Sequence, residues 1–189
     1  MIFSLEGLPH PGREAVLKYV AHKMRGTVPL IHHQCIADRG VSASYPILLS
    51  ILRNVQQLKR MGSERHVLIG RPFVDGSHIP IVARVHLDVY HELLRRLIGT
   101  TAEAYIFVHI RCDAHDCFER LSTLPASHLV SLEDVGISQR LIHTTLQAQG
   151  THILEIECPA FFDDNDALVE RLGMRALQFF ATHMSSKPG

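Results

Sequence analysis

Short apolar runs that alternate with helical stripes are the feature of this sequence that most restricts its fold. The apolar runs cover residues 2–6, 28–32, 66–69, 104–110 and 152–156. Between them, apolar residues recur at helical spacing, for example over residues 45–61 and 79–98. Strands that read as continuous apolar runs are buried on both faces, as in a parallel sheet covered by helices. The sequence therefore predicts an α/β fold with a parallel five-stranded sheet and helices on both faces.

The remaining helical segments and the chain length predict a single domain. Further helices are expected over residues 15–24, from the cap Asp113 to about Leu121, over 132–148, and from a cap at Asp163 or Asp164 to about Ala181. A chain of 189 residues has the usual size of one domain. We therefore predict one domain over residues 1–184 and a frayed tail over residues 185–189.

The charge, the lengths of the apolar runs and the cysteines restrict the partners and the compartment that we expect. Lys plus Arg and Asp plus Glu number 19 each, so no overall positive field favours a nucleic acid. No apolar run approaches the roughly 18 residues of a membrane span, and residues 1–6 lack a signal-peptide pattern. The four cysteines are scattered, which is typical of reduced thiols. We expect a cytoplasmic protein that binds neither nucleic acid nor a membrane.

The loop after the first strand has the spacing of a phosphate-binding loop. Residues 7–14 contain G-x-x-x-x-G between an expected strand and an expected helix. A working loop carries Lys and Ser or Thr where this chain has Arg13 and Glu14. Arg13 keeps the positive charge, whereas the carboxylate of Glu14 repels a triphosphate unless Mg²⁺ bridges them. The alternative is a turn stiffened by Pro9 and Pro11, with Glu14 near the positive end of the helix dipole.

Several segments together resemble the deoxynucleoside kinases, a family related to thymidylate kinases. Residues 2–7 (I-F-S-L-E-G) are similar to the I-x-I-E-G that leads into that family's phosphate loop. Residues 104–121 resemble its strand ending in Y-L-R and the following S-P-E-x-C-x-x-R-I helix. Residues 130–135 and 152–156 are similar to its I-P-L-E-Y-L segment and its closing strand V-L-V-L-D. The resemblance covers nearly the whole chain in order.

The resemblance implies a P-loop-kinase-like fold and a thymidine- or deoxycytidine-kinase-like activity. Such an enzyme transfers the γ-phosphoryl group of ATP to a deoxynucleoside 5′-hydroxyl with Mg²⁺. The implied partner is a small-molecule nucleoside or nucleotide, and a homodimer is expected by the same resemblance.

The family's functional positions are only partly retained in this chain. The family's general base is a glutamate, and His32 and His33 occupy that stretch and can accept a proton near neutral pH. Arg71 matches the arginine of the E-R-S motif, and Arg120 is the one lid arginine of three that remains. The expected catalytic residues are therefore Arg13, His32, His33, Arg71 and Arg120; the cofactor-binding residues are Gly7, His10, Gly12, Arg13 and Glu14; the metal ligands are Glu14 and Asp75.

Two functions follow from these substitutions. The first is a deoxynucleoside-kinase-like protein, nominally ATP-dependent, with an eroded active site. The second is a non-catalytic pseudokinase that acts as a nucleoside- or protein-binding module. An open loop lined by amides would favour catalysis, and a loop filled by its own side chains would not.

A zinc site is not expected where His109, Cys112, His115 and Cys117 occur within nine residues. Alternation along the strand directs His109 away from the other three, and no second pair has zinc-finger spacing. The adjacent His32 and His33 face opposite sides of a strand, so they do not form a metal pair.

Overall fold

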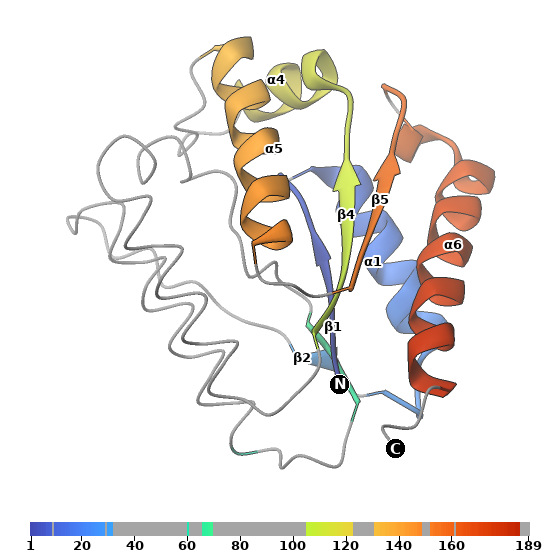
Figure 1. Ribbon diagram of the computed structural model, residues 1–189. Coiled ribbons are helices and arrows are strands. Elements are labelled where there is room, and N and C mark those ends of the chain that lie inside the picture. The colour runs from blue at the N-terminus through green and yellow to red at the C-terminus, as the bar shows by residue number, and fades with distance from the viewer. Residues whose placement is uncertain are drawn as a thin grey trace.

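The protein has a parallel sheet with its first strand in the interior (Figure 1). The computed structural model describes residues 1–8, 10–28, 30–31, 60, 66–69, 105–122, 131–148, 152–160 and 162–185. The strands are β1 (Ile2–Glu6), β2 (Leu30–Ile31), β3 (Val67–Ile69), β4 (Tyr105–Arg111) and β5 (His152–Glu157). Their order is β2-β3-β1-β4-β5, and every neighbouring pair is parallel. The parallel α/β sheet predicted from the apolar runs is confirmed.

Four strands have three to seven residues, and the two-residue β2 extends the sheet at one edge. All residues of β1 are buried because β3 and β4 flank it and helices cover it. Ile2 pairs in register with Val67 on one side and with Tyr105 on the other. The end of β1 therefore delivers Gly7 to the middle of the carboxyl edge of the sheet, where α/β proteins bind ligands.

Helices pack on both sides of the sheet (Figure 1). The helices α1 (Pro11–Lys23) and α6 (Asp166–Ser185) lie side by side on one face, and the short η1 (Phe162–Asp164) precedes α6. The helices α4 (Ala114–Ser122) and α5 (Leu132–Gln147) pack together, with α5 against the other face. Phe3 of β1 packs on Phe180 of α6 with ring centroids 4.8 Å apart, which anchors α6 to the centre of the sheet.

The helix ends show where local sequence signals were correct and where they failed. Asp113 caps α4 as predicted, because its Oδ1 accepts hydrogen bonds from the backbone amides of His115 and Asp116. Asn165 caps α6 through the amide of Leu168, so the predicted cap at Asp163 or Asp164 is wrong.

The first helix begins at Pro11 rather than at residue 15, because proline is well suited to the first helical position. The helix α6 continues through Ser185. The helices expected over 45–61 and 79–98 lie outside the described residues.

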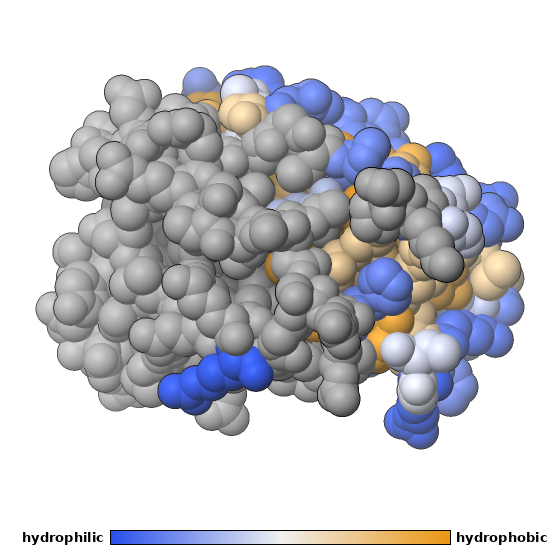
Figure 2. All heavy atoms as spheres, turned by 60° about the horizontal axis from the view of Figure 1, so that its bottom comes forward, coloured by the Kyte–Doolittle hydropathy of each residue, from blue (hydrophilic) through white to orange (hydrophobic). Residues whose placement is uncertain are grey.

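Figure 2 turns the molecule so that the lower end of Figure 1 comes forward, and colours the described residues by hydropathy. In this view, hydrophilic residues form most of the outer edge of the described part, and hydrophobic residues lie inside this edge. Among the described helices, none combines the length and the apolar character needed to cross a membrane.

Candidate functional site

The loop between β1 and α1 is held close to β4. Gly7 has a φ of +142°, a conformation that strongly favours glycine. A Cβ atom at Gly7 would lie 2.5 Å from the carbonyl oxygen of Ile110 in β4. The first glycine of the phosphate-loop pattern is therefore required by backbone conformation and by close backbone packing.

His10 occupies the amino end of α1. Its backbone is extended (φ −148°, ψ 135°), and its Nδ1 accepts a hydrogen bond of 2.9 Å from the backbone N–H of Gly12. The imidazole is buried and stacks on the ring of Phe162, with centroids 5.6 Å apart and an interplanar angle of 9°. In phosphate-binding loops, backbone amides at this end of the helix point at the anion. Here the Gly12 amide is already bound by a neutral side chain of the same loop.

Asp116 of α4 holds the other side of the His10 ring. Its Oδ2 lies 3.0 Å from His10 Nε2, and both side chains are completely buried. Since Nδ1 is an acceptor, Nε2 carries the proton and donates a hydrogen bond to this carboxylate. Arg120 Nε donates to Asp116 Oδ1 at 2.7 Å, and Arg120 Nη2 lies 3.9 Å from Asp164 Oδ2. The Asp116 carboxylate thus links the loop to an arginine expected to contact phosphate.

Phe162 covers Gly12. A Cβ atom at Gly12 would lie 2.1 Å from Cζ of this ring, and Phe162 is itself buried. The second glycine of the pattern therefore makes room for an aromatic side chain of the protein itself.

Arg13 and Glu14 are paired with each other. The buried Arg13 guanidinium donates from Nη2 to Oε1 of the half-exposed Glu14 carboxylate. Arg13 Nε has no hydrogen-bond partner among the described residues. The cation that a working loop directs at the terminal phosphates is here neutralised by its neighbour.

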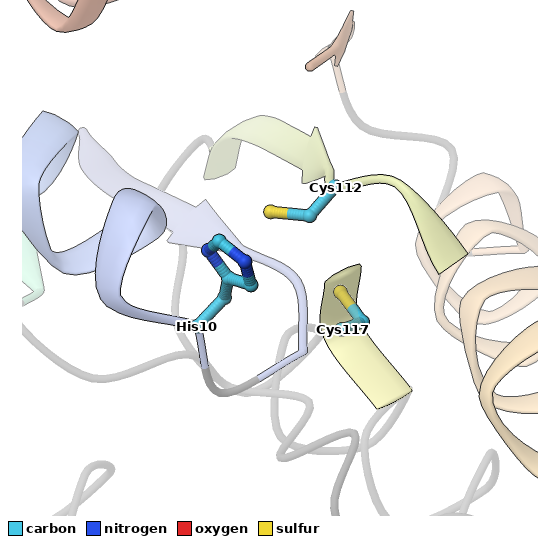
Figure 3. Close-up of side chains that lie close together, drawn as sticks. All are labelled: His10, Cys112 and Cys117. Carbon is cyan, nitrogen blue, oxygen red and sulfur yellow. The ribbon is translucent and has the colours of Figure 1, made fainter. Parts of the chain in front are cut away.

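Cys112, directly after β4, and Cys117 of α4 approach His10 (Figure 3). One imidazole nitrogen and the two sulfur atoms all lie within 4.8 Å of one another, and the three residues are buried. Gln139 Nε2 donates to the Cys112 carbonyl oxygen at 2.8 Å and lies 4.0 Å from Cys117 Sγ. The hydrogen bond with Cys117, together with burial, raises the pKa of the Cys112 thiol well above its usual value.

His109 belongs to a different cluster, on the α5 side of the sheet. Its Nδ1 lies 3.0 Å from Glu155 Oε1, and His143 Nδ1 lies 2.7 Å from the same oxygen. Burial lowers the pKa of His109 to about 4, although Glu155 opposes this shift. His109 Nε2 has no hydrogen-bond partner in the described part of the chain. As strand alternation predicted, His109 does not join Cys112 and Cys117.

The structure brings together one part of the predicted site. The expected cofactor-binding residues Gly7, His10, Gly12, Arg13 and Glu14 lie in one loop and helix start. Arg120 connects to this group through Asp116. His32, His33, Arg71 and Asp75 lie outside the described residues.

Sequence reasoning missed three contributors to this site: Asp116, Phe162, and the pairing of His10 with the two cysteines. The spacing of Asp116 and Arg120, four residues apart on a helix, is the one local signal that pointed to an ion pair. The other contacts join distant segments and left no local pattern.

Comparisons with solved structures show the fold. A deoxyadenosine kinase from M. mycoides with dCMP and dCDP bound has a TM-score of 0.60 at 11% identity, over 96% of this chain and 100% of that chain. The same enzyme with dATP gives 0.60 at 11% identity, over 94% and 99%. YorR from Bacillus subtilis, in complex with phosphorylated GDP, gives 0.55 at 11% identity, over 99% and 100%. No protein-family model and no curated protein matches the sequence. The chain thus shares with these solved structures an α/β fold with a parallel sheet.

Proposed function

We propose that this protein is a deoxynucleoside-kinase-like nucleoside-binding protein whose phosphate loop has lost ATP-dependent phosphoryl transfer. The likeness in fold to a deoxyadenosine kinase over nearly the whole chain supports the first half of the proposal. Solved structures with this fold hold nucleotides such as dCMP and dATP. The observation that carries the second half is the hydrogen bond from the Gly12 amide to the buried His10 ring.

A phosphate group can reach the Gly12 amide only if the His10 ring leaves. The ring would then lose its bonds to the Gly12 amide and to Asp116, both inside the protein. Removing a partner from a buried polar group costs about 1–3 kcal/mol, and more for a charged group. Since each 1.4 kcal/mol is a factor of about ten in affinity, displacing His10 alone weakens nucleotide binding by roughly one to two orders of magnitude.

The charges around the loop add to this penalty. Glu14 and Asp116 contribute carboxylates to the region in which a triphosphate would lie. A single like-charge contact at 4 Å costs up to about 4 kcal/mol at an effective dielectric constant of 20, and the cost is smaller here because an arginine is paired with each carboxylate. Arg13 is paired with Glu14, and Arg120 is paired with Asp116, so these two cations are already partly neutralised.

Thermal unfolding with separate ligands tests the two halves of the proposal. We expect no stabilisation by millimolar Mg²⁺-ATP relative to Mg²⁺ alone, and no phosphorylated product. We expect stabilisation by at least one of thymidine, deoxycytidine, deoxyadenosine and deoxyguanosine. A ligand at 100 times its Kd adds about 2.7 kcal/mol, which raises Tm by roughly 5–10 °C in a chain of this size.

The variant His10→Gly is the matched test of the loop. Removing the ring frees the Gly12 amide, so the variant should show more stabilisation by Mg²⁺-ATP than the unmodified protein. Large stabilisation of the unmodified protein by ATP, with product formation that Arg13→Ala abolishes, would establish an active kinase instead. Failure of every nucleoside to stabilise the protein would overturn the nucleoside-binding half.

A further inference from the structure

We propose that His10, Cys112 and Cys117 form a binding site for a thiolate-preferring metal ion, with Zn²⁺ as the expected ion. The three side chains come from the cap residue of α1, the residue after β4 and the helix α4, and their donor atoms converge in the interior (Figure 3). The inference is independent of the proposed function, because it requires no nucleoside and no phosphate.

The spacing of the donor atoms suits a tetrahedral ion after small adjustments. The nitrogen and the two sulfur atoms lie within 4.8 Å of one another. In tetrahedral zinc sites the Zn–S distance is about 2.3 Å and the Zn–N distance about 2.0 Å, so donor atoms are roughly 3.3–3.8 Å apart. The donors therefore need to approach one another by at most about 1.5 Å, which side-chain rotation can supply.

The groups around the two sulfur atoms include one buried cation and one amide donor. The cation is Arg13, which is buried. Gln139 Nε2, 4.0 Å from Cys117 Sγ, provides an N–H group directed at the second sulfur. Asp116 Oδ2 lies 3.0 Å from His10 Nε2 and is a hydrogen-bond partner of the imidazole outside the group of three donors. Buried thiolates with a histidine and an outer hydrogen-bonding group are typical of zinc sites.

Metal binding exchanges one bond of His10 for a coordinate bond. Without metal, Nδ1 accepts from the Gly12 amide and Nε2 donates to Asp116. An ion on either nitrogen replaces one of these two partners, and the thiols release their protons as it binds. The soft sulfur donors select Zn²⁺ over Mg²⁺, so this site differs in chemistry from the Mg²⁺ site expected at Glu14 and Asp75.

Titration of the reduced full-length protein with Co²⁺ tests the proposal, because thiolate-bound Co²⁺ has a sulfur-to-metal charge-transfer band in the near ultraviolet. We expect this band to saturate at one equivalent of Co²⁺ and to disappear when Zn²⁺ is added. Cys112→Ser and Cys117→Ser should each weaken binding by about tenfold or more and reduce the band.

Two control variants keep the result specific. Cys35→Ser keeps the proposed donors and should leave the band unchanged. His143→Ala removes one member of the separate cluster of His109, His143 and Glu155, and it should also leave the band unchanged. Circular dichroism and thermal unfolding of each variant confirm that it folds.

Two outcomes overturn the proposal. One is a Co²⁺ spectrum of the unmodified protein without the charge-transfer band, which means nitrogen or oxygen ligands only or no binding. The other is a band that persists in the Cys112→Ser/Cys117→Ser double variant. Because both readouts are spectroscopic, they are unaffected by whether any nucleoside binds.

Discussion

His10 and Asp116 lie 106 positions apart in the sequence, yet His10 Nε2 and Asp116 Oδ2 are 3.0 Å apart with neither side chain exposed. His10 also caps α1 through the Gly12 amide, and Asp116 also accepts from Arg120. One buried pair therefore connects the loop after β1 to the helix after β4. The same pair lies at the amino end of α1, where backbone amides can bind an anion, and His10 accepts from one of these amides.

We expect the His10–Asp116 pair to stabilise the fold. His10→Ala removes the helix cap and the imidazole donor to a buried carboxylate, which should lower the free energy of unfolding by about 2–4 kcal/mol. Asp116→Ala should also destabilise the protein. In a double-mutant cycle by urea unfolding, the two changes should couple by about 1–3 kcal/mol. Additive losses would contradict a direct interaction. Glu170→Gln, at the exposed contact with Tyr19, is the control and should change stability by at most about 1 kcal/mol.

We expect the size of the side chain at position 12 to be limited by the ring of Phe162. The methyl group of Gly12→Ala would lie 2.1 Å from Cζ of Phe162, so the ring has to shift. Overpacking of this kind costs about 1–3 kcal/mol. In Gly12→Ala/Phe162→Leu the smaller side chain makes room, so thermal unfolding should show less destabilisation than the sum of the single variants. A double variant as unstable as that sum would mean that Gly12 is needed for another reason.

We expect stability to fall as the pH decreases from about 6.5 to 4. The pKa of His109 is about 4 in the folded protein because of burial, against an ordinary value of 6.5. Between these values the unfolded chain binds more protons, so its population grows as the pH falls. The shift corresponds to a loss of about 3 kcal/mol across this range.

Glu155, the carboxylate bonded to His109, also contributes to the loss of stability as the pH falls. Burial alone would raise the pKa of Glu155, but hydrogen bonds from His109 and His143 outweigh it and lower that pKa. Its contribution to stability is therefore lost as the pH falls below the ordinary value of 4.5. Urea unfolding at a series of pH values checks the prediction. His109→Gln should flatten the profile between pH 4 and 6.5, and His115→Gln at an exposed position should leave it unchanged. A steep profile that survives in His109→Gln would assign the effect to another group.

Local patterns were enough to predict the parallel sheet, because strands buried on both faces need continuous apolar runs, and β1, β3 and β4 have them. They also predicted the Asp113 cap, since a capping side chain bonds to amides two and three residues ahead. The true start of α1 was not predicted, because histidine is an uncommon cap and its role depends on Asp116 and Phe162.

The sequence by itself determined the fold class and the position of the loop from Gly7 to Glu14, because periodicity and glycine spacing act over a few neighbouring residues. Only the tertiary structure decided what fills that loop. The contacts of His10 with Asp116, Phe162, Cys112 and Cys117 join segments more than a hundred residues apart in the chain. Such contacts depend on how β1 and β4 bring their carboxyl ends together, and no local pattern records them.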